Sequence, residues 1–286
     1  MKIKLGKCGN IKSTLILLLF FTGLFIFNVS VAREQDKTDE NFRKPRNGNT
    51  FVVAHRGAHI GIPENSLPAF QKAIDLGIDF VEIDTRLTKD GQIVSVHNST
   101  IDQYVVGHKG KVSDFTLAEL KAMSIGEKLG PEWKNTTIPT FEEILQLCQG
   151  KIGIYLDLKE PLIKELLPII LKYGMESDII WYISGNRMEE IKLLKSLCVE
   201  CFPMPDPGPE KNIAAVCNQL HPQVLASDMG QLSESFVKTA HDFGAKVIVD
   251  EKKGTPEEWE QILKWGTDGI QTDNPEALLN FLKKRK

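Results

Sequence analysis

Beginning at Phe51, short β-rich runs alternate with helical patterns, and this alternation restricts the possible folds more than any other feature of the chain. Regular alternation of strands and helices is typical of parallel sheets built from βα units. Eight such units in succession predict a (β/α)8 TIM barrel, an α/β fold, with a doubly wound open sheet as the main alternative. The expected strands are 51–55, 79–84, 152–158, 178–184, 200–204, 223–228, 246–250 and 268–272.

Capping residues mark where several of the intervening helices begin and end. Ser66 is expected to cap a helix that stops at Gly77, and Thr140 forms a capping box with Glu143. Asn274, followed by proline, is expected to cap the last helix. These signals place helices between the expected strands, as a βα alternation requires.

One stretch interrupts the alternation. After the second strand, an extra strand is expected at 93–97, followed by an irregular segment with several glycines and a proline. We interpret residues from about 98 to 138 as a small insertion after the second strand, covering the barrel mouth. The predicted barrel domain therefore spans 51–286 and includes this insertion.

The first 32 residues have the pattern of a signal peptide. Four lysines and no acidic residue precede an apolar run at 15–29, which ends in the small residues of 30–32. The alternative is an uncleaved anchor helix, although the apolar run is short and interrupted for a membrane span. Residues 33–50 are polar and are expected to form a flexible linker. The pattern predicts export to the periplasm or the extracellular space, with membrane attachment only if the N-terminal segment is retained.

The charge of the chain limits its possible partners. The full sequence has a formal net charge of -3, and removal of the signal peptide would take away four lysines and no acid. The only strongly basic stretch is the tail at 283–286, so the sequence does not favour nucleic-acid binding. An acidic protein that binds phosphate needs a metal ion or a fixed arginine to hold it.

Two of the five cysteines, Cys198 and Cys201, are spaced like metal ligands. No second pair of this kind completes a zinc site. In an exported protein, buried thiols or one disulfide bond are the favoured interpretation.

Polar residues cluster where the expected strands end, which is where TIM barrels carry their active sites. Glu82 and Asp84 lie two apart in one strand, so their side chains point the same way, and Asp157 lies in the following barrel strand, near its end. Each alone could be a turn former or could point outward. Three inward carboxylates together need a cation, and oxygen ligands favour Mg²⁺ or Ca²⁺. Other polar residues near strand ends are His55, Arg56, His97 and Lys159.

A series of motifs follows in a fixed order along the chain: His55-Arg56-Gly57, Pro63-Glu64-Asn65-Ser66, Glu82-Ile83-Asp84, Thr88-Lys89-Asp90-Gly91, His97, and Gly269-Ile270-Gln271-Thr272-Asp273. Together they resemble the glycerophosphodiester phosphodiesterases, from about Phe51 to the end of the chain. The resemblance implies a metal-dependent hydrolase on a TIM barrel. Such an enzyme cleaves a small-molecule glycerophosphodiester to glycerol 3-phosphate and an alcohol.

The resemblance also implies a role for each site residue. Glu82, Asp84 and Asp157 would hold the metal, and His55 and His97 would act as the acid/base pair. The substrate-binding residues would be Arg56, Lys159 and Glu64. In the implied mechanism, the neighbouring glycerol hydroxyl attacks the phosphorus, and water then opens the resulting cyclic phosphate.

Two departures from the family pattern leave other functions open. Asn98 stands where the family usually has Asp, and Asp157 stands where it usually has Glu. Asp at the latter position also resembles the spider-venom phospholipases D, which cyclise their substrates without hydrolysing them. The alternatives are therefore a cyclising lyase and a non-catalytic phosphodiester-binding surface protein. His59, four residues after His55, is a further candidate for lining the pocket.

Overall fold

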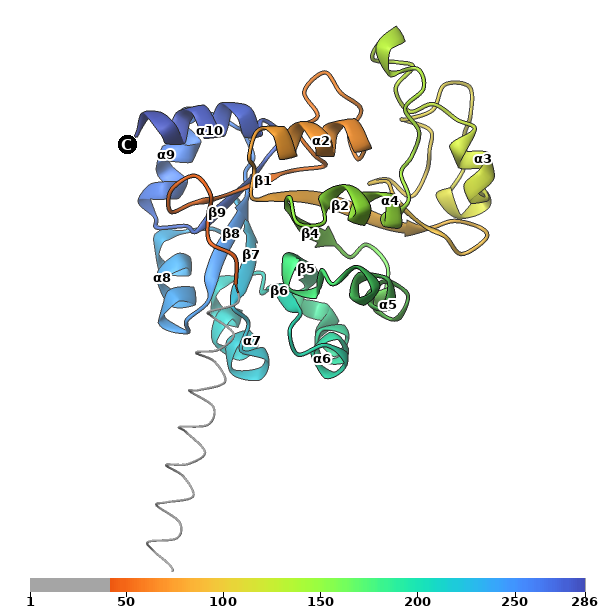
Figure 1. Ribbon diagram of the computed structural model, residues 1–286. Coiled ribbons are helices and arrows are strands. Elements are labelled where there is room, and N and C mark those ends of the chain that lie inside the picture. The colour runs from red at the N-terminus through yellow and green to blue at the C-terminus, as the bar shows by residue number, and fades with distance from the viewer. Residues whose placement is uncertain (1–41, 286) are drawn as a thin grey trace, which may run out of the picture. The chain divides into compact units, whose positions relative to one another are not determined.

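The computed structural model describes residues 42–285, and the predicted signal peptide lies outside them. Eight parallel strands form one sheet in the order β6-β5-β4-β2-β1-β9-β8-β7 (Figure 1). The two ends of this order, β6 and β7, lie side by side, so the sheet curls into a nearly closed barrel and the TIM-barrel prediction is confirmed. The strands are β1 Phe51–Ala54, β2 Phe80–Leu87, β4 Gly153–Asp157, β5 Ile179–Ser184, β6 Phe202–Asp206, β7 Val224–Asp228, β8 Lys246–Asp250 and β9 Gly269–Thr272.

The barrel has one seam without a backbone ladder, between β6 and β7. β6 contains Pro203 and Pro205, which have no N–H to donate. Both prolines point to the same side of the strand, and β6 pairs with β5 over its full length. The edge of β6 that faces β7 therefore lacks these two N–H donors, and no backbone ladder forms between β6 and β7. β6 also lies two residues later than expected.

The helices cover the outside of the barrel, with most of the hydrophobic core between them and the strands (Figure 1). Ser66, Thr140 and Asn274 accept hydrogen bonds as N-caps, as predicted. Within residues 42–285, no helix has both the length and the apolar character to cross a bilayer. The barrel helices are α2 Leu67–Asp75, α4 Phe141–Cys148, α5 Ile163–Tyr173, α6 Met188–Leu197, α7 Ile213–Leu220, α8 Glu234–Asp242, α9 Pro256–Lys264 and α10 Pro275–Lys284.

The insertion forms a small unit with its own core beyond the end of β2 (Figure 1). It follows β3, Ile93–Ser95, which pairs antiparallel with β2, is shorter than expected and adds Val94 to the same core. It also contains α3, Leu117–Lys121. Its buried apolar residues are Val94, Val96, Ile101, Val105, Val112, Leu120, Ile125 and Ile138. A separate core allows the insertion to hold its shape beside the barrel.

Residues just before β1 make specific contacts at the base of the barrel. Arg43 pairs with Asp178 at 3.5 Å. The backbone N–H of Arg46 donates to Asp79 at 2.7 Å. These contacts attach the part of the predicted linker nearest β1 to the barrel, and the compact unit includes the residues from Arg43 onward. The earlier part of the predicted linker lies outside the described residues.

The cysteine pair Cys198 and Cys201 forms a disulfide bond between α6 and β6. Cys148 and Cys217 are free and buried. This arrangement matches the disulfide interpretation and leaves Cys198 and Cys201 unavailable as zinc ligands.

Candidate active site

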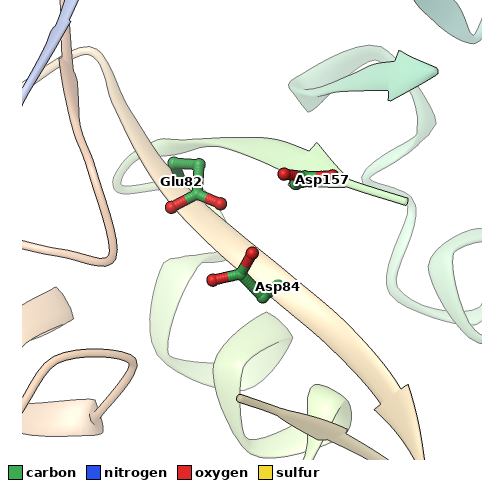
Figure 2. Close-up of side chains that lie close together, drawn as sticks. All are labelled: Glu82, Asp84 and Asp157. Atoms are coloured by element: carbon green, nitrogen blue, oxygen red, sulfur yellow. The ribbon is translucent and has the colours of Figure 1, made fainter. Parts of the chain in front are cut away.

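Three acidic side chains converge inside the barrel near the ends of its strands. Glu82 and Asp84 project from β2, and Asp157 ends β4 opposite Asp84 (Figure 2). One carboxylate oxygen from each residue lies within 4.8 Å of the others. Glu82 is 2% exposed and Asp84 is fully buried. The two-residue spacing in β2 thus places both side chains where Asp157 meets them.

Burial shields the carboxylates of this cluster from water, so solvation stabilises their negative charges only weakly. Burial raises the pKa of Glu82 well above its usual value, and repulsion from Asp84 and Asp157 adds to the effect. Burial also raises the pKa of Asp157, although Lys159 opposes that shift. Buried carboxylates this close together remain ionised only where positive charge balances them.

Two basic side chains supply part of that charge. The Nζ atom of Lys159 lies 3.1 Å from an oxygen of Asp84 and also donates to Asp157. Burial lowers the pKa of Lys159, but the two carboxylates outweigh it and the net shift is upward. The Nε atom of Arg56 lies 3.8 Å from Asp84. Both cations therefore stay protonated beside the cluster.

The loop between β1 and α2 is shaped to reach this cluster. Arg56 has a φ of 53°, a left-handed conformation uncommon for a side chain of this size, and its backbone N–H donates to Glu82 at 2.7 Å. Gly57 follows with a φ of 86°, and a Cβ there would lie 2.8 Å from that of Ala69. Only glycine allows the loop to approach α2 so closely.

His55, at the end of β1, is held by an acidic partner. Its Nδ1 lies 2.7 Å from Asp273, which follows β9, and its Nε2 lies 4.0 Å from Glu82. The hydrogen bond with His55 lowers the pKa of Asp273, so this carboxylate is ionised near neutral pH. The arrangement directs the second ring nitrogen of His55 toward the carboxylate cluster.

His97 has a neutral partner instead. Its Nδ1 lies 2.9 Å from the amide oxygen of Asn98, and Arg86 donates to its carbonyl oxygen at 3.0 Å. The backbone N–H of Val96 donates to the carbonyl oxygen of Asp84 at 3.1 Å, which places the next residue, His97, beside the cluster. Asn98 therefore orients this imidazole without adding a charge.

Glu64 and His59 complete the predicted set at the loop after β1. Glu64 accepts two hydrogen bonds from Nη1 of Arg56, each 3.1 Å long. These two residues line a cavity of about 300 Å³ between the loop and the insertion. His59 bonds to the carbonyl oxygen of His55 at 2.9 Å, and its Nε2 lies 3.8 Å from Asp273. The insertion therefore contributes a side wall to the mouth.

All eight predicted site residues meet at one end of the barrel, and their individual roles stay predictions. Sequence reasoning did not assign a role to Asp273, Asn65 or Arg86. Asn65 donates to Asp84 at 2.8 Å and accepts from Ser95 at 2.7 Å. Asp273 and Asn65 stand in motifs noted in the sequence, and the position of Asp273 directly after a strand was the available signal.

The carboxylate cluster fits a hard divalent cation. Its donors are all oxygen atoms, and burial together with repulsion from Asp84 and Asp157 raises the pKa of Glu82, so a cation would stabilise the ionised cluster. Mg²⁺ and Ca²⁺ prefer such oxygen ligands, whereas Zn²⁺ and Cu²⁺ more often take histidine or cysteine. Glu82, Asp84 and Asp157 are the residues that could hold such an ion.

Solved structures of similar fold come from several organisms. A phosphodiesterase from Oleispira antarctica, in complex with the product sn-glycerol-3-phosphate, superposes with a TM-score of 0.72 at 24% identity, covering 82% of this chain and 96% of the other. A glycerophosphodiester phosphodiesterase from Agrobacterium tumefaciens also has a TM-score of 0.72, at 23% identity, covering 81% and 99%. At these identities the likeness establishes the barrel fold.

Sequence comparison identifies the family. The model of the glycerophosphoryl diester phosphodiesterase family matches residues 55–184, which include every predicted site residue. A glycerophosphodiester phosphodiesterase from Caldanaerobacter subterraneus subsp. tengcongensis is 32% identical over 258 residues, covering 82% of this chain and 98% of the relative. The chain therefore belongs to the glycerophosphoryl diester phosphodiesterase family and is a hydrolase of that family.

Proposed function

We propose that this protein is a metal-dependent hydrolase that cleaves glycerophosphodiesters to glycerol 3-phosphate and an alcohol. The observation that carries the proposal is the cluster of Glu82, Asp84 and Asp157 inside a barrel mouth that also holds two imidazoles and two fixed cations. Membership of the family supports the same reaction.

The basic residues would bind the phosphodiester. Arg56 is held by Glu64 through two hydrogen bonds, so its guanidinium is oriented before substrate arrives. Lys159 presents an ammonium group at the opposite edge of the carboxylate cluster. Glu82, Asp84 and Asp157 would hold Mg²⁺ or Ca²⁺, which when bound neutralises charge on the phosphate oxygens. Arg56 and Lys159 stabilise the additional charge of the transition state.

His55 and His97 would move the protons. Each uses Nδ1 to bond a neighbouring side chain, which leaves Nε2 to exchange a proton with substrate. One imidazole removes the proton of the glycerol hydroxyl as its oxygen attacks the phosphorus, and the other protonates the departing alcohol oxygen. With the roles exchanged, water opens the cyclic phosphate to give glycerol 3-phosphate. Imidazole suits both steps because its usual pKa is near 6.5.

Export is part of the proposal. The N-terminal pattern of lysines, apolar residues and small residues supports it. The disulfide between Cys198 and Cys201 is a second supporting observation, since such bonds persist mainly in oxidising compartments.

Product analysis tests the reaction. The purified protein with glycerophosphodiester and Mg²⁺ or Ca²⁺ is expected to release free glycerol 3-phosphate, and to lose this activity on chelation until a divalent ion is returned. An accumulating cyclic phosphate would instead identify a cyclising lyase. Binding without turnover would identify a non-catalytic protein, and activity that survives exhaustive chelation would contradict the metal role.

A further inference from the structure

Across the barrel from β2, three consecutive strands end in aspartate. Asp206 ends β6, Asp228 ends β7 and Asp250 ends β8; we refer to these three residues as the aspartate arc. Asp228 and Asp250 are register partners. In β8, Val247 and Val249 belong to the core packed against the helices. Because side chains alternate along a strand, Asp250 lies on the opposite face, toward the inside of the barrel.

The carboxylates of the aspartate arc have no salt-bridge partner within residues 42–285. Among the basic groups of this part of the chain, His55 is the one that opposes the raised pKa of Asp250. Asp206 accepts from the N–H of Gly208 at 2.8 Å and from the hydroxyl of Tyr182 at 3.3 Å, and Asp228 accepts from the N–H of Gly230 at 2.6 Å. These bonds explain why aspartate suits a strand end, but they do not balance three charges. Burial raises the pKa of Asp206 and of Asp250, and repulsion from Asp228 adds to both shifts.

A buried amide beside the aspartate arc points to a ligand. Gln271 in β9 is the register partner of Asp250 and is 6% exposed. Its amide interacts with the Asp250 carboxylate, while its Oε1 has no hydrogen-bond partner. A buried acceptor without a donor is unfavourable, and here it adjoins carboxylates that form no salt bridge in the described part of the chain. A positively charged group that carries N–H donors would satisfy the amide oxygen and the carboxylates together.

The aspartate arc adjoins the predicted reaction centre. Asp250 and His55 line one cavity of about 300 Å³ at the ends of β1, β8 and β9. The Nε2 atom of His55 lies 4.0 Å from Glu82, so this cavity opens beside the carboxylate cluster. A substrate with phosphate at the cluster can therefore extend its alcohol portion past His55 toward Asp250.

We propose that the aspartate arc and Gln271 bind a protonated primary amine on the alcohol portion of the substrate. The inference rests on the proposed function and names its substrate class as glycerophosphodiesters of amino alcohols. A primary ammonium donates hydrogen bonds to the carboxylates and to Oε1 of Gln271, whereas a quaternary ammonium has no N–H to donate. The loop after β8 also brings Lys252 and Lys253 to the cavity. Their positive charge would oppose binding of an ammonium group, so the proposal is tested with substrates whose alcohol portions differ in charge.

The experiment compares kcat/KM for glycerophosphoethanolamine, glycerophosphocholine and the uncharged bis-glycerol diester glycerophosphoglycerol. Wild-type protein is expected to prefer the ethanolamine diester over the glycerol diester by about tenfold, with the choline diester between them. Asp228→Asn keeps the side-chain oxygen that accepts from Gly230 and removes only the charge, so the preference is expected to fall by about threefold to tenfold. Asp206→Asn provides a second isosteric variant with the same expectation.

Asp242→Asn is the matched control, because Asp242 lies on α8, is exposed and pairs with Lys238. This variant is expected to retain the wild-type preference. Equal hydrolysis of the ethanolamine and glycerol diesters by wild type, or an unchanged preference in both Asp228→Asn and Asp206→Asn, overturns the inference alone. Failure to hydrolyse any of the three diesters would instead contradict the proposed function.

Discussion

The two halves of the barrel mouth use the same kinds of acidic residue in different ways. In the half formed by β1, β2 and β4, Glu82 and Asp84 are buried and bonded to Arg56, Asn65 and Lys159. In the half formed by β6, β7 and β8, Asp228 and Asp250 are exposed in the mouth and bond little besides their own loop or a neighbouring strand. The carboxylates of the first half are positioned by other side chains before substrate binds. Among the described residues, the aspartates of the second half have no basic partner of this kind and are open to a cationic group of the substrate.

The connecting segments explain the difference. The loop after β1 folds back over the barrel through the left-handed Arg56 and the close approach of Gly57 to α2. By contrast, Asp206 and Asp228 accept hydrogen bonds from the residue two positions later, which closes a short turn at each strand end. A folded-back loop can supply partners to buried carboxylates, and a short turn cannot.

The largest effect is expected from the histidines in the first half. His55→Ala or His97→Ala should each lower kcat by at least about 10²-fold, because each removes a proton-transfer group. Steady-state kinetics, with circular dichroism as a check on folding, measure the effect. His241→Ala is the matched control, since His241 lies on α8 and bonds to Asp268. A near-normal rate in either test variant would remove that residue from the proposed mechanism.

A smaller effect is expected from the partners of the two histidines. Asp273→Asn keeps a hydrogen-bond acceptor beside His55 but removes its charge, and kcat should fall by about tenfold. Asn98→Asp adds a charge beside His97 without removing the acceptor, so we expect a change of less than about threefold. The pH profiles of kcat for both variants provide the measurement. A near-normal kcat in Asp273→Asn would show that the charge on Asp273 does not matter.

The smallest effect concerns the stability of the metal-free protein. Burial and the neighbouring carboxylates raise the folded-state pKa of Glu82, and burial raises that of Asp157. At a pH above their unfolded-state pKa values, these two groups bind more protons in the folded protein than in the unfolded chain. The free energy of unfolding therefore falls as the pH rises. Each unit of upward shift corresponds to about 1.4 kcal/mol. Thermal unfolding should therefore give a lower Tm at about pH 8 than at about pH 5.5.

Two comparisons test the origin of this trend. Glu82→Gln should flatten the pH dependence, and added Mg²⁺ or Ca²⁺ should raise Tm more at the higher pH, where the carboxylates are ionised. Asp273 has a lowered pKa, so its contribution is lost on acidification below its usual range and does not counteract the trend near neutrality. A Tm that rises steadily over the same range would contradict the role of the cluster.

Much of the fold followed from local patterns. The alternation of strands and helices predicted the barrel, and Ser66, Thr140 and Asn274 cap their helices as expected. The end of β6 was not predicted, because Pro203 and Pro205 lie in it and proline is uncommon inside strands. The separate core of the insertion was also missed, since its apolar residues follow no single period.

By itself, the sequence determined the repeating strand-helix order and the pair of inward carboxylates in β2, because both depend on periods of a few residues. Tertiary structure decided which side chains contact the residues of the site. His55 meets Asp273 from 218 residues away, and Gln271 lies beside Asp250 only because β8 and β9 pair. Closure of the sheet brings distant strand ends to one edge, and no local pattern specifies which side chains then share hydrogen bonds and charge.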